Sequence, residues 1–105
     1  MLRLTLIAAL ALGASACAGS DVDCGPITGT IAITDAQVSP DLARVSAEDA
    51  RAAALVDVPG ATVTDLDLDE EDGFLVYEVE LTQDRTEFDV VVDAGSGEVL
   101  CSERD

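Results

Sequence analysis

Apolar and polar residues alternate with a period of two over four segments in the second half of this 105-residue chain. Alternation of this kind places successive side chains on opposite faces of a β-strand. The pattern therefore predicts strands over residues 62–69, 74–82, 87–93 and 98–101. The connections carry glycine, at Asp72-Gly73 and within residues 94–97, as tight turns require. Consecutive strands are therefore expected to pair as an antiparallel meander.

One helix is predicted ahead of these strands, over residues 47–56. Ser46 suits the N-cap position because its hydroxyl can accept a hydrogen bond from a first-turn N–H. Glu48 and Asp49 place negative charge at the positive end of the helix dipole, and Pro59-Gly60 ends the helix. The apolar side consists mostly of small residues, which allows close packing on a sheet. These residues are Val45, Ala50, Ala53, Ala54 and Leu55.

The same alternation assigns the strand residues to two faces of the sheet. An apolar face, expected to form the core beneath the helix, holds Thr64, Leu66, Leu68, Leu75, Tyr77, Val79, Leu81, Phe88, Val90 and Val92. An acidic face holds Asp65, Asp67, Glu78, Glu80, Asp89 and Asp93, interrupted by Val63, Phe74, Val76 and Val91. The sequence thus predicts an α+β fold in which one helix packs on a four-stranded antiparallel sheet.

Four features follow one another within residues 45–101: the SAEDARAAAL helix, the Val58-Pro59-Gly60 break, the Asp72-Gly73 turn before LVYEVEL, and a closing segment from Asp93 to Val99. Together they resemble one complete PepSY domain. The resemblance implies a cystatin-like fold, in agreement with the alternation. It also implies a module that binds or restrains peptidases, because PepSY domains are similar to parts of the propeptides of thermolysin-type metallopeptidases. A lone domain of this kind would act in trans.

Residues 1–16 have the features of a secretory signal peptide. Arg3 is followed by the apolar run LTLIAALALGA and by small residues before Cys17. The segment ASAC resembles a lipobox, in which the cysteine is lipidated and becomes the mature N-terminus, although Ala14 stands where Leu is usual. Lipidation at Cys17 and ordinary signal-peptidase cleavage are the two interpretations, and both predict an exported protein of the cell envelope. The lipid would anchor it to the membrane.

Two segments lie between this signal and the domain, a tether and an N-terminal extension. Residues 17–25 are mostly small and polar and are predicted to form a tether. Residues 26–44 form an N-terminal extension, in which the β-branched, alternating segment 27–34 suggests an extra strand. Pro40 is suited to begin a short helical turn.

The chain has three cysteines, an odd number for an exported protein. If Cys17 carries a lipid, Cys24 and Cys101 are left to form a disulfide that encloses most of the mature chain. Two separate thiols are the alternative, since the sequence does not fix connectivity.

The chain is strongly acidic, with a net charge of −17 and neither lysine nor histidine. Such a charge repels phosphate backbones and anionic lipid surfaces, so nucleic acid is not an expected partner. Without lysine and histidine, the commonest general base and the Schiff-base amine are missing, and the cysteines have no CxxC spacing. We therefore expect no enzyme, and we predict no catalytic residue, cofactor or dedicated metal site.

The acidic face allows two interpretations. It is either a solvated surface that discourages aggregation, or a binding surface for an envelope protein, with a peptidase as one candidate. The partner-binding residues in the second case would be Asp65, Asp67, Phe74, Val76, Glu78, Glu80, Asp89 and Val91. Low-affinity calcium binding is an alternative function, although Glu70 stands where an EF-hand loop that begins at Asp65 needs glycine.

Overall fold

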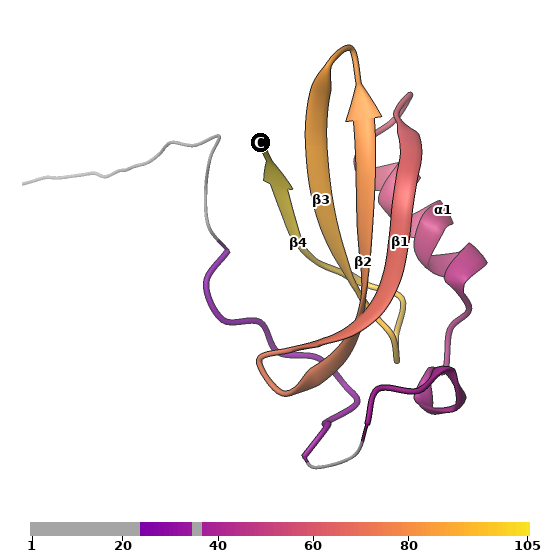
Figure 1. Cartoon of the computed structure of the whole chain (residues 1–105), viewed down its shortest axis with the longest axis vertical. Coiled ribbons are helices and arrows are strands. Elements are labelled where there is room, and N and C mark those ends of the chain that lie inside the picture. The colour runs from indigo at the N-terminus through magenta and orange to yellow at the C-terminus, as the bar shows by residue number, and fades with distance from the viewer. Residues whose placement is uncertain (1–23, 35–36) are drawn as a thin grey trace, which may run out of the picture.

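The computed structural model describes residues 24–34 and 37–105. A four-stranded antiparallel meander in the order β1-β2-β3-β4 carries one helix across one of its faces (Figure 1), which confirms the predicted fold class. The elements are the 3-10 helix η2 (Pro40–Leu42), the helix α1 (Ala47–Asp57), and the strands β1 (Thr62–Glu71), β2 (Phe74–Gln83), β3 (Thr86–Asp93) and β4 (Val99–Arg104).

Helix α1 begins and ends where the sequence predicts, within one residue. Ser46 Oγ accepts from the Asp49 N–H at 3.1 Å, and the Asp49 carboxylate accepts from the Ser46 N–H at 3.2 Å. This reciprocal capping box satisfies two of the N–H groups that a helix start leaves without intrahelical partners. Ala50 and Ala54 are fully buried against the sheet. Their small side chains let the helix backbone lie close to the strands.

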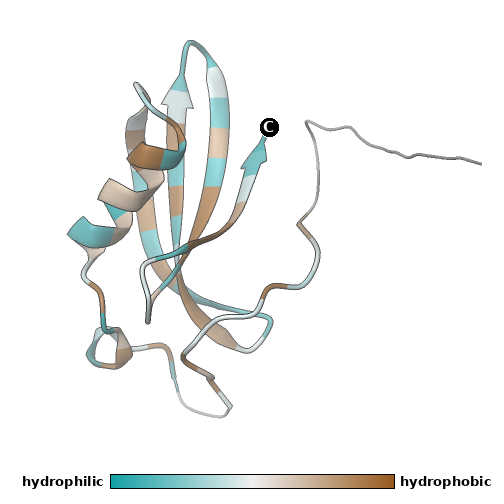
Figure 2. Cartoon of the chain, turned by 180° about the vertical axis from the view of Figure 1, so that it is seen from behind, coloured by the Kyte–Doolittle hydropathy of each residue, from teal (hydrophilic) through white to brown (hydrophobic). Residues whose placement is uncertain are grey.

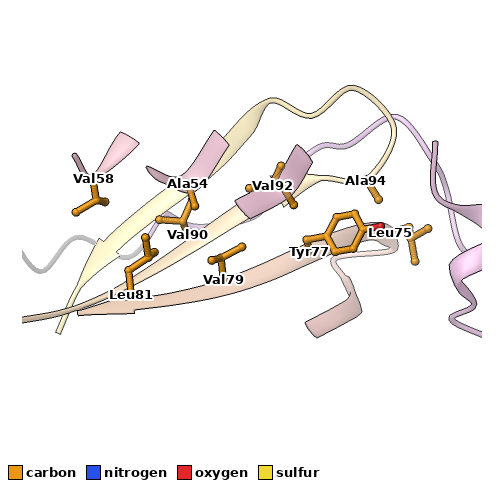
Figure 3. Packing of buried hydrophobic residues seen from close by; sticks show 10 residues of the cluster. Ala54, Val58, Leu75, Tyr77, Val79, Leu81, Val90, Val92 and Ala94 are labelled. Carbon is orange, nitrogen blue, oxygen red and sulfur yellow. The ribbon is translucent and has the colours of Figure 1, made fainter. Parts of the chain in front are cut away.

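The main core lies between α1 and the sheet, and Figure 3 shows its side chains converging from both layers. Tyr77 belongs to this core, and its hydroxyl donates to the Val45 carbonyl at 2.8 Å. Burial raises the pKa of Tyr77, and the nearby Asp49 carboxylate raises it further. The buried residues of this cluster are Ala50, Ala54, Val58, Leu75, Tyr77, Val79, Leu81, Val90, Val92 and Ala94.

Hydrophilic and hydrophobic segments follow one another along the strands in Figure 2. The faces predicted for the start of β1 differ from those observed. The β1–β2 register shifts between Val63 and Asp65, so Thr64 is an extra residue without a direct partner. Val63 consequently packs against the main core, whereas Thr64 is exposed and its hydroxyl donates to the Glu80 carbonyl at 3.2 Å. The predicted positions of Val63 on the acidic face and Thr64 on the core face were therefore wrong, because a bulge reverses the alternation before it.

The N-terminal extension forms one bridge instead of the extra strand that its alternation suggested. Ala32 forms an isolated antiparallel β-bridge with Phe74, and Leu75 N–H donates to the Ile31 carbonyl at 2.9 Å. These bonds use the first residues of β2, beyond the end of β3. The extension therefore closes one end of the sheet and does not widen it. Pro40 begins η2, as expected.

A disulfide joins Cys24 to Cys101 in β4, with the two Cα atoms 5.9 Å apart. This confirms the predicted pairing and excludes two separate thiols in this structure. Ile27, three residues after Cys24, packs on Val76, Val91 and Cys101. The disulfide and Ile27 thus build a second, smaller core on the sheet face opposite α1.

No helix within the described ranges is long and apolar enough to cross a bilayer. The predicted signal peptide, the lipidation site Cys17 and most of the tether lie outside the described residues.

Candidate functional site

Carboxylates form a row across the full width of the sheet, on the face opposite α1. The strand register places Asp65 opposite Glu80, and Glu80 opposite Asp89. On the far side Asp89 lies opposite Glu103 of β4. Asp67 and Glu78 form a second acidic pair, one step along β1 and β2. Like charges placed directly opposite each other destabilise a sheet, so this arrangement costs folding free energy.

The carboxylates of this row and of the second pair, apart from Asp65, line a hollow of about 310 Å³. Its lining residues are Asp67, Glu71, Glu78, Glu80, Asp89, Val91 and Glu103. Among residues 24–34 and 37–105, the only ion pair is between Glu48 and Arg51 on α1, at 4.0 Å. The carboxylates of the hollow are therefore not neutralised by any described arginine.

Two residues of the hollow, Glu71 and Glu103, were not predicted as site residues. Glu71 ends β1 at the hairpin, and Glu103 lies in β4, which continues to Arg104 and not only to Cys101. The apolar pattern ends near Cys101, so the strand was predicted to end there. The spacing of two between Cys101 and Glu103 is the signal that places both on one face.

The pKa of Glu78 is raised to about 7 by its surroundings. Burial is the largest cause, followed by hydrogen bonding with the Glu71 carboxyl and by the negative charges of Asp69, Glu71 and Asp67. The pKa of Asp89 is raised too, first by burial and then by Asp105, Glu80 and Glu103. Protonated Glu78 can share its proton with Glu71, which lowers the charge density of the hollow near neutral pH.

Raised carboxyl pKa values predict that the fold is more stable at about pH 5 than at about pH 8. In the folded protein Glu78 holds a proton up to about pH 7, whereas its ordinary pKa is 4.5. Its stabilising contribution is therefore complete below the lower value and is lost as the pH rises through the higher one. Asp89 acts in the same direction. Thermal unfolding at the two pH values measures the difference.

The matched variant for this prediction is Glu78→Gln. The neutral amide should melt at a higher temperature than the wild type at pH 8 and should show a weaker pH dependence between the two values. A wild-type melting temperature that is equal or higher at pH 8 would contradict the prediction.

The apolar residues predicted for partner binding lie mostly under the extension. Val76 is fully buried, and Val91 is 9% exposed, because Ile27 covers both. Phe74 is half-buried beside Gly29 and pairs with Ala32. The extension therefore contacts all three residues. Of the predicted set, Asp65, Asp67, Glu78, Glu80 and Asp89 make up the accessible acidic surface.

Asp93 was predicted on the acidic face but is only 1% exposed. Its carboxylate accepts hydrogen bonds from the N–H and Oγ1 of Thr30, at 3.3 and 2.9 Å, and from Gly95 N–H at 3.1 Å and Ser96 Oγ at 2.7 Å. Burial alone would raise the pKa of Asp93, but hydrogen bonds from Ser96, Gly95 and Thr30 outweigh it and lower the pKa. Asp93 thus connects the extension to the β3–β4 turn and does not belong to the binding surface.

Two groups of residues carry side chains that are common metal ligands. Cys24, Cys101 and Glu103 lie close together, but the two sulfur atoms are bonded to each other and offer no thiolate. The acidic stretch from Asp65 to Gly73 forms strand β1 and a two-residue turn, in which Asp72 and Gly73 have φ of 53° and 89°. This stretch is therefore part of a hairpin. It is not an EF-hand loop, in agreement with the residue spacing, which lacks the glycine that such a loop needs.

Comparison with known protein families gives one match. Residues 44–103 match the model of the family described as PepSY, peptidase propeptide and YPEB domain. This match covers more than half of the chain and all of α1 and β1 to β3. No curated protein and no solved structure matches the chain.

Proposed function

Because this chain belongs to the PepSY family, we propose that it is an exported module that binds another protein of the cell envelope and restrains a peptidase in trans. The family is named for peptidase propeptides, which is consistent with a regulatory and non-catalytic role. The match includes all of α1 and the strands β1 to β3, and a module of this kind would act on its partner in trans. The peptidase would then be a separate protein.

The observation that carries this proposal is the row of carboxylates across all four strands. Asp65, Glu80, Asp89 and Glu103 stand side by side without a described cation to pair with. A partner that presents arginine or lysine side chains would relieve their repulsion and form charge-assisted hydrogen bonds. The hollow behind the row is large enough to receive such side chains. Recognition would therefore depend on charge and weaken with salt.

Binding of a basic partner would also release protons near neutral pH. The pKa of Glu78 is raised to about 7 by burial and by neighbouring carboxyls. A cation placed in the hollow favours the ionised carboxylate and lowers this pKa. Affinity is therefore expected to increase as the pH rises from about 6 to about 8.

The cellular setting is part of the proposal. Signal cleavage before Cys17 and lipidation at this residue would anchor the domain to a membrane through a short tether. The disulfide between Cys24 and Cys101 supports export, since such bonds persist in oxidising compartments. A Cys17→Ser variant expressed with its signal should lose membrane attachment if the lipid is the anchor.

The test is crosslinking capture from envelope extract, at low and moderate salt, with partners identified by mass spectrometry. The bait is the Cys17→Ser mature domain, alone and with Glu78, Glu80 and Asp89 all changed to lysine. A matched control reverses three exposed carboxylates elsewhere, Asp41, Asp57 and Glu98, for the same change in net charge. We expect a recurrent peptidase that the first variant loses and the control retains. Equal capture by all three baits would refute the acidic face as the binding surface.

Calcium binding is the second candidate function, and one observation favours it. Glu71 Oε1 is buried and has no hydrogen-bond partner among the described residues, beside the other carboxylates of the hollow. Carboxylate oxygens are the ligands that calcium prefers. Calorimetry distinguishes the two cases: saturable calcium binding that persists in moderate salt supports a site, and binding lost by screening indicates only an anionic surface.

A further inference from the structure

Strand β1 has one free edge, because it lies at the end of the strand order and pairs only with β2 among the described residues. In an antiparallel ladder successive residues direct their N–H and C=O groups alternately toward and away from the partner strand. The hairpin pair is Glu71 and Phe74, so the groups of Leu66, Leu68 and Glu70 point away from β2. These three alternate residues therefore direct their main-chain groups to the side of β1 on which a further strand could pair.

An apolar groove of about 580 Å³ runs along the α1 side of the same edge. It lies between β1 and the segment that leads into α1, which are neighbours in Figure 1. Leu66 and Leu68 form its floor and are only half-buried, although they belong to the core face. The other lining residues are Pro40, Ala43, Arg44, Val45, Ser46, Ala47 and Tyr77.

The other side of β1 is acidic at every alternate position, at Asp65, Asp67 and Asp69. Two of these carboxylates also accept hydrogen bonds from main-chain N–H groups at the free edge of β1. Asp65 Oδ1 accepts from Leu66 N–H at 3.0 Å, and Asp69 Oδ1 accepts from Glu70 N–H at 2.7 Å. Both N–H groups belong to the outward set. A neutral strand that pairs with this edge has to displace two charge-assisted hydrogen bonds, which is unfavourable unless the carboxylates gain other partners.

We propose that the β1 edge binds an extended segment of another protein in which apolar side chains alternate with lysine or arginine. An added strand continues the pleat, so its side chains alternate between the groove and the acidic side. Apolar residues then contact Leu66 and Leu68, and the basic residues pair with the carboxylates that leave the edge. The partner's carbonyl groups replace these carboxylates on the Leu66 and Glu70 amides.

This inference rests on the proposed function only because it requires a protein partner. It adds the binding site, the β1 edge, and the kind of segment that this edge binds. The probe is a synthetic peptide of three lysines alternating with three valines or leucines, with blocked ends. Binding to the Cys17→Ser mature domain is measured by fluorescence polarisation. A peptide of the same composition with its lysines in one block controls for attraction to the acidic chain. We expect it to bind about tenfold more weakly, since it cannot supply both faces at once.

Methylation of peptide nitrogens separates strand pairing from simple charge attraction. In antiparallel addition, the amides of the apolar residues face β1, and those of the lysines face solvent. Methylating the apolar positions should therefore reduce affinity about tenfold, and methylating the lysine positions should have little effect. The opposite pattern supports parallel addition at the same edge. The inference is overturned if four peptides bind with equal affinity: the alternating peptide, the peptide with its lysines in one block, and the two methylated peptides.

A groove variant of the protein locates the site. Ala47→Phe places a bulky side chain in the groove from an exposed position, and Val56→Phe adds the same group on α1 at a site that is 80% exposed and outside the groove. The first variant should lose peptide affinity and the second should keep it; equal affinity of both overturns the groove assignment. Peptide binding without any captured envelope protein would argue against the proposed function alone, and capture without peptide discrimination would argue against this inference alone.

Discussion

Reduction of the Cys24–Cys101 disulfide is expected to lower the free energy of unfolding by about 4.5 kcal/mol, the largest single effect that we predict. The two cysteines are 77 residues apart, so the bond removes much of the conformational freedom of the unfolded chain. Ile27 also depends on this bond, because it packs on Cys101 and its neighbours only three residues from Cys24. A core this small has little stability to spare.

Chemical denaturation of the Cys17→Ser domain, with and without a reducing agent, measures this effect. The matched control is the same domain with serine at positions 24 and 101, which should already be less stable and should not respond to the reducing agent. A change of less than about 1 kcal/mol on reduction would show that closing the loop between Cys24 and Cys101 does not stabilise the folded state to the expected extent.

The second large effect is expected from Asp93→Ala, at about 3 kcal/mol of lost stability. The carboxylate is buried and accepts four hydrogen bonds, two of them from Thr30 in the extension. Alanine leaves these partly buried donors without their acceptor, and donors left without a partner are costly. Because the pKa of Asp93 is lowered by those bonds, its contribution is present above the ordinary value of 3.8 and is lost as the pH falls below it.

Asp89→Ala is the control for this variant, since it removes an equal charge from the same strand. Asp89 lies in the acidic row, where its pKa is raised by burial and by neighbouring carboxylates. Its removal should leave stability at about pH 8 unchanged or increase it. Thermal unfolding of the two variants should therefore shift in different directions or by clearly different amounts. Similar losses for both would show that Asp93 has no special role.

Local spacing was sufficient to predict the helix, the four strands and the meander. The Ser46 cap, the glycine turns and the alternation each act between residues close in sequence, so each can be read without knowledge of the fold. The acidic rows followed from the same alternation, because short hairpins fix which residues face one another across neighbouring strands.

The errors arose where distant segments decide the outcome. Nothing near Asp93 in the sequence indicates that Thr30, from the N-terminal extension, donates to its carboxylate. Val76 and Val91 are buried by Ile27, which the disulfide holds in place from outside the family domain. The bulge at Thr64 depends on the β1–β2 register, and β4 continues past its apolar residues because β3 supplies partners as far as Arg104. These features depend on tertiary contacts that the local pattern does not contain.

The position of the disulfide also decides how the domain responds to mechanical force. Residues 25 to 100 lie within a loop closed by a covalent bond, and the chain that precedes Cys24 is joined through this bond to β4. Tension applied to the preceding chain therefore passes directly into the last strand of the sheet. The disulfide holds the start of the extension at β4, so the contacts of Ile27, Ala32 and Asp93 do not have to resist this tension alone while the bond is intact.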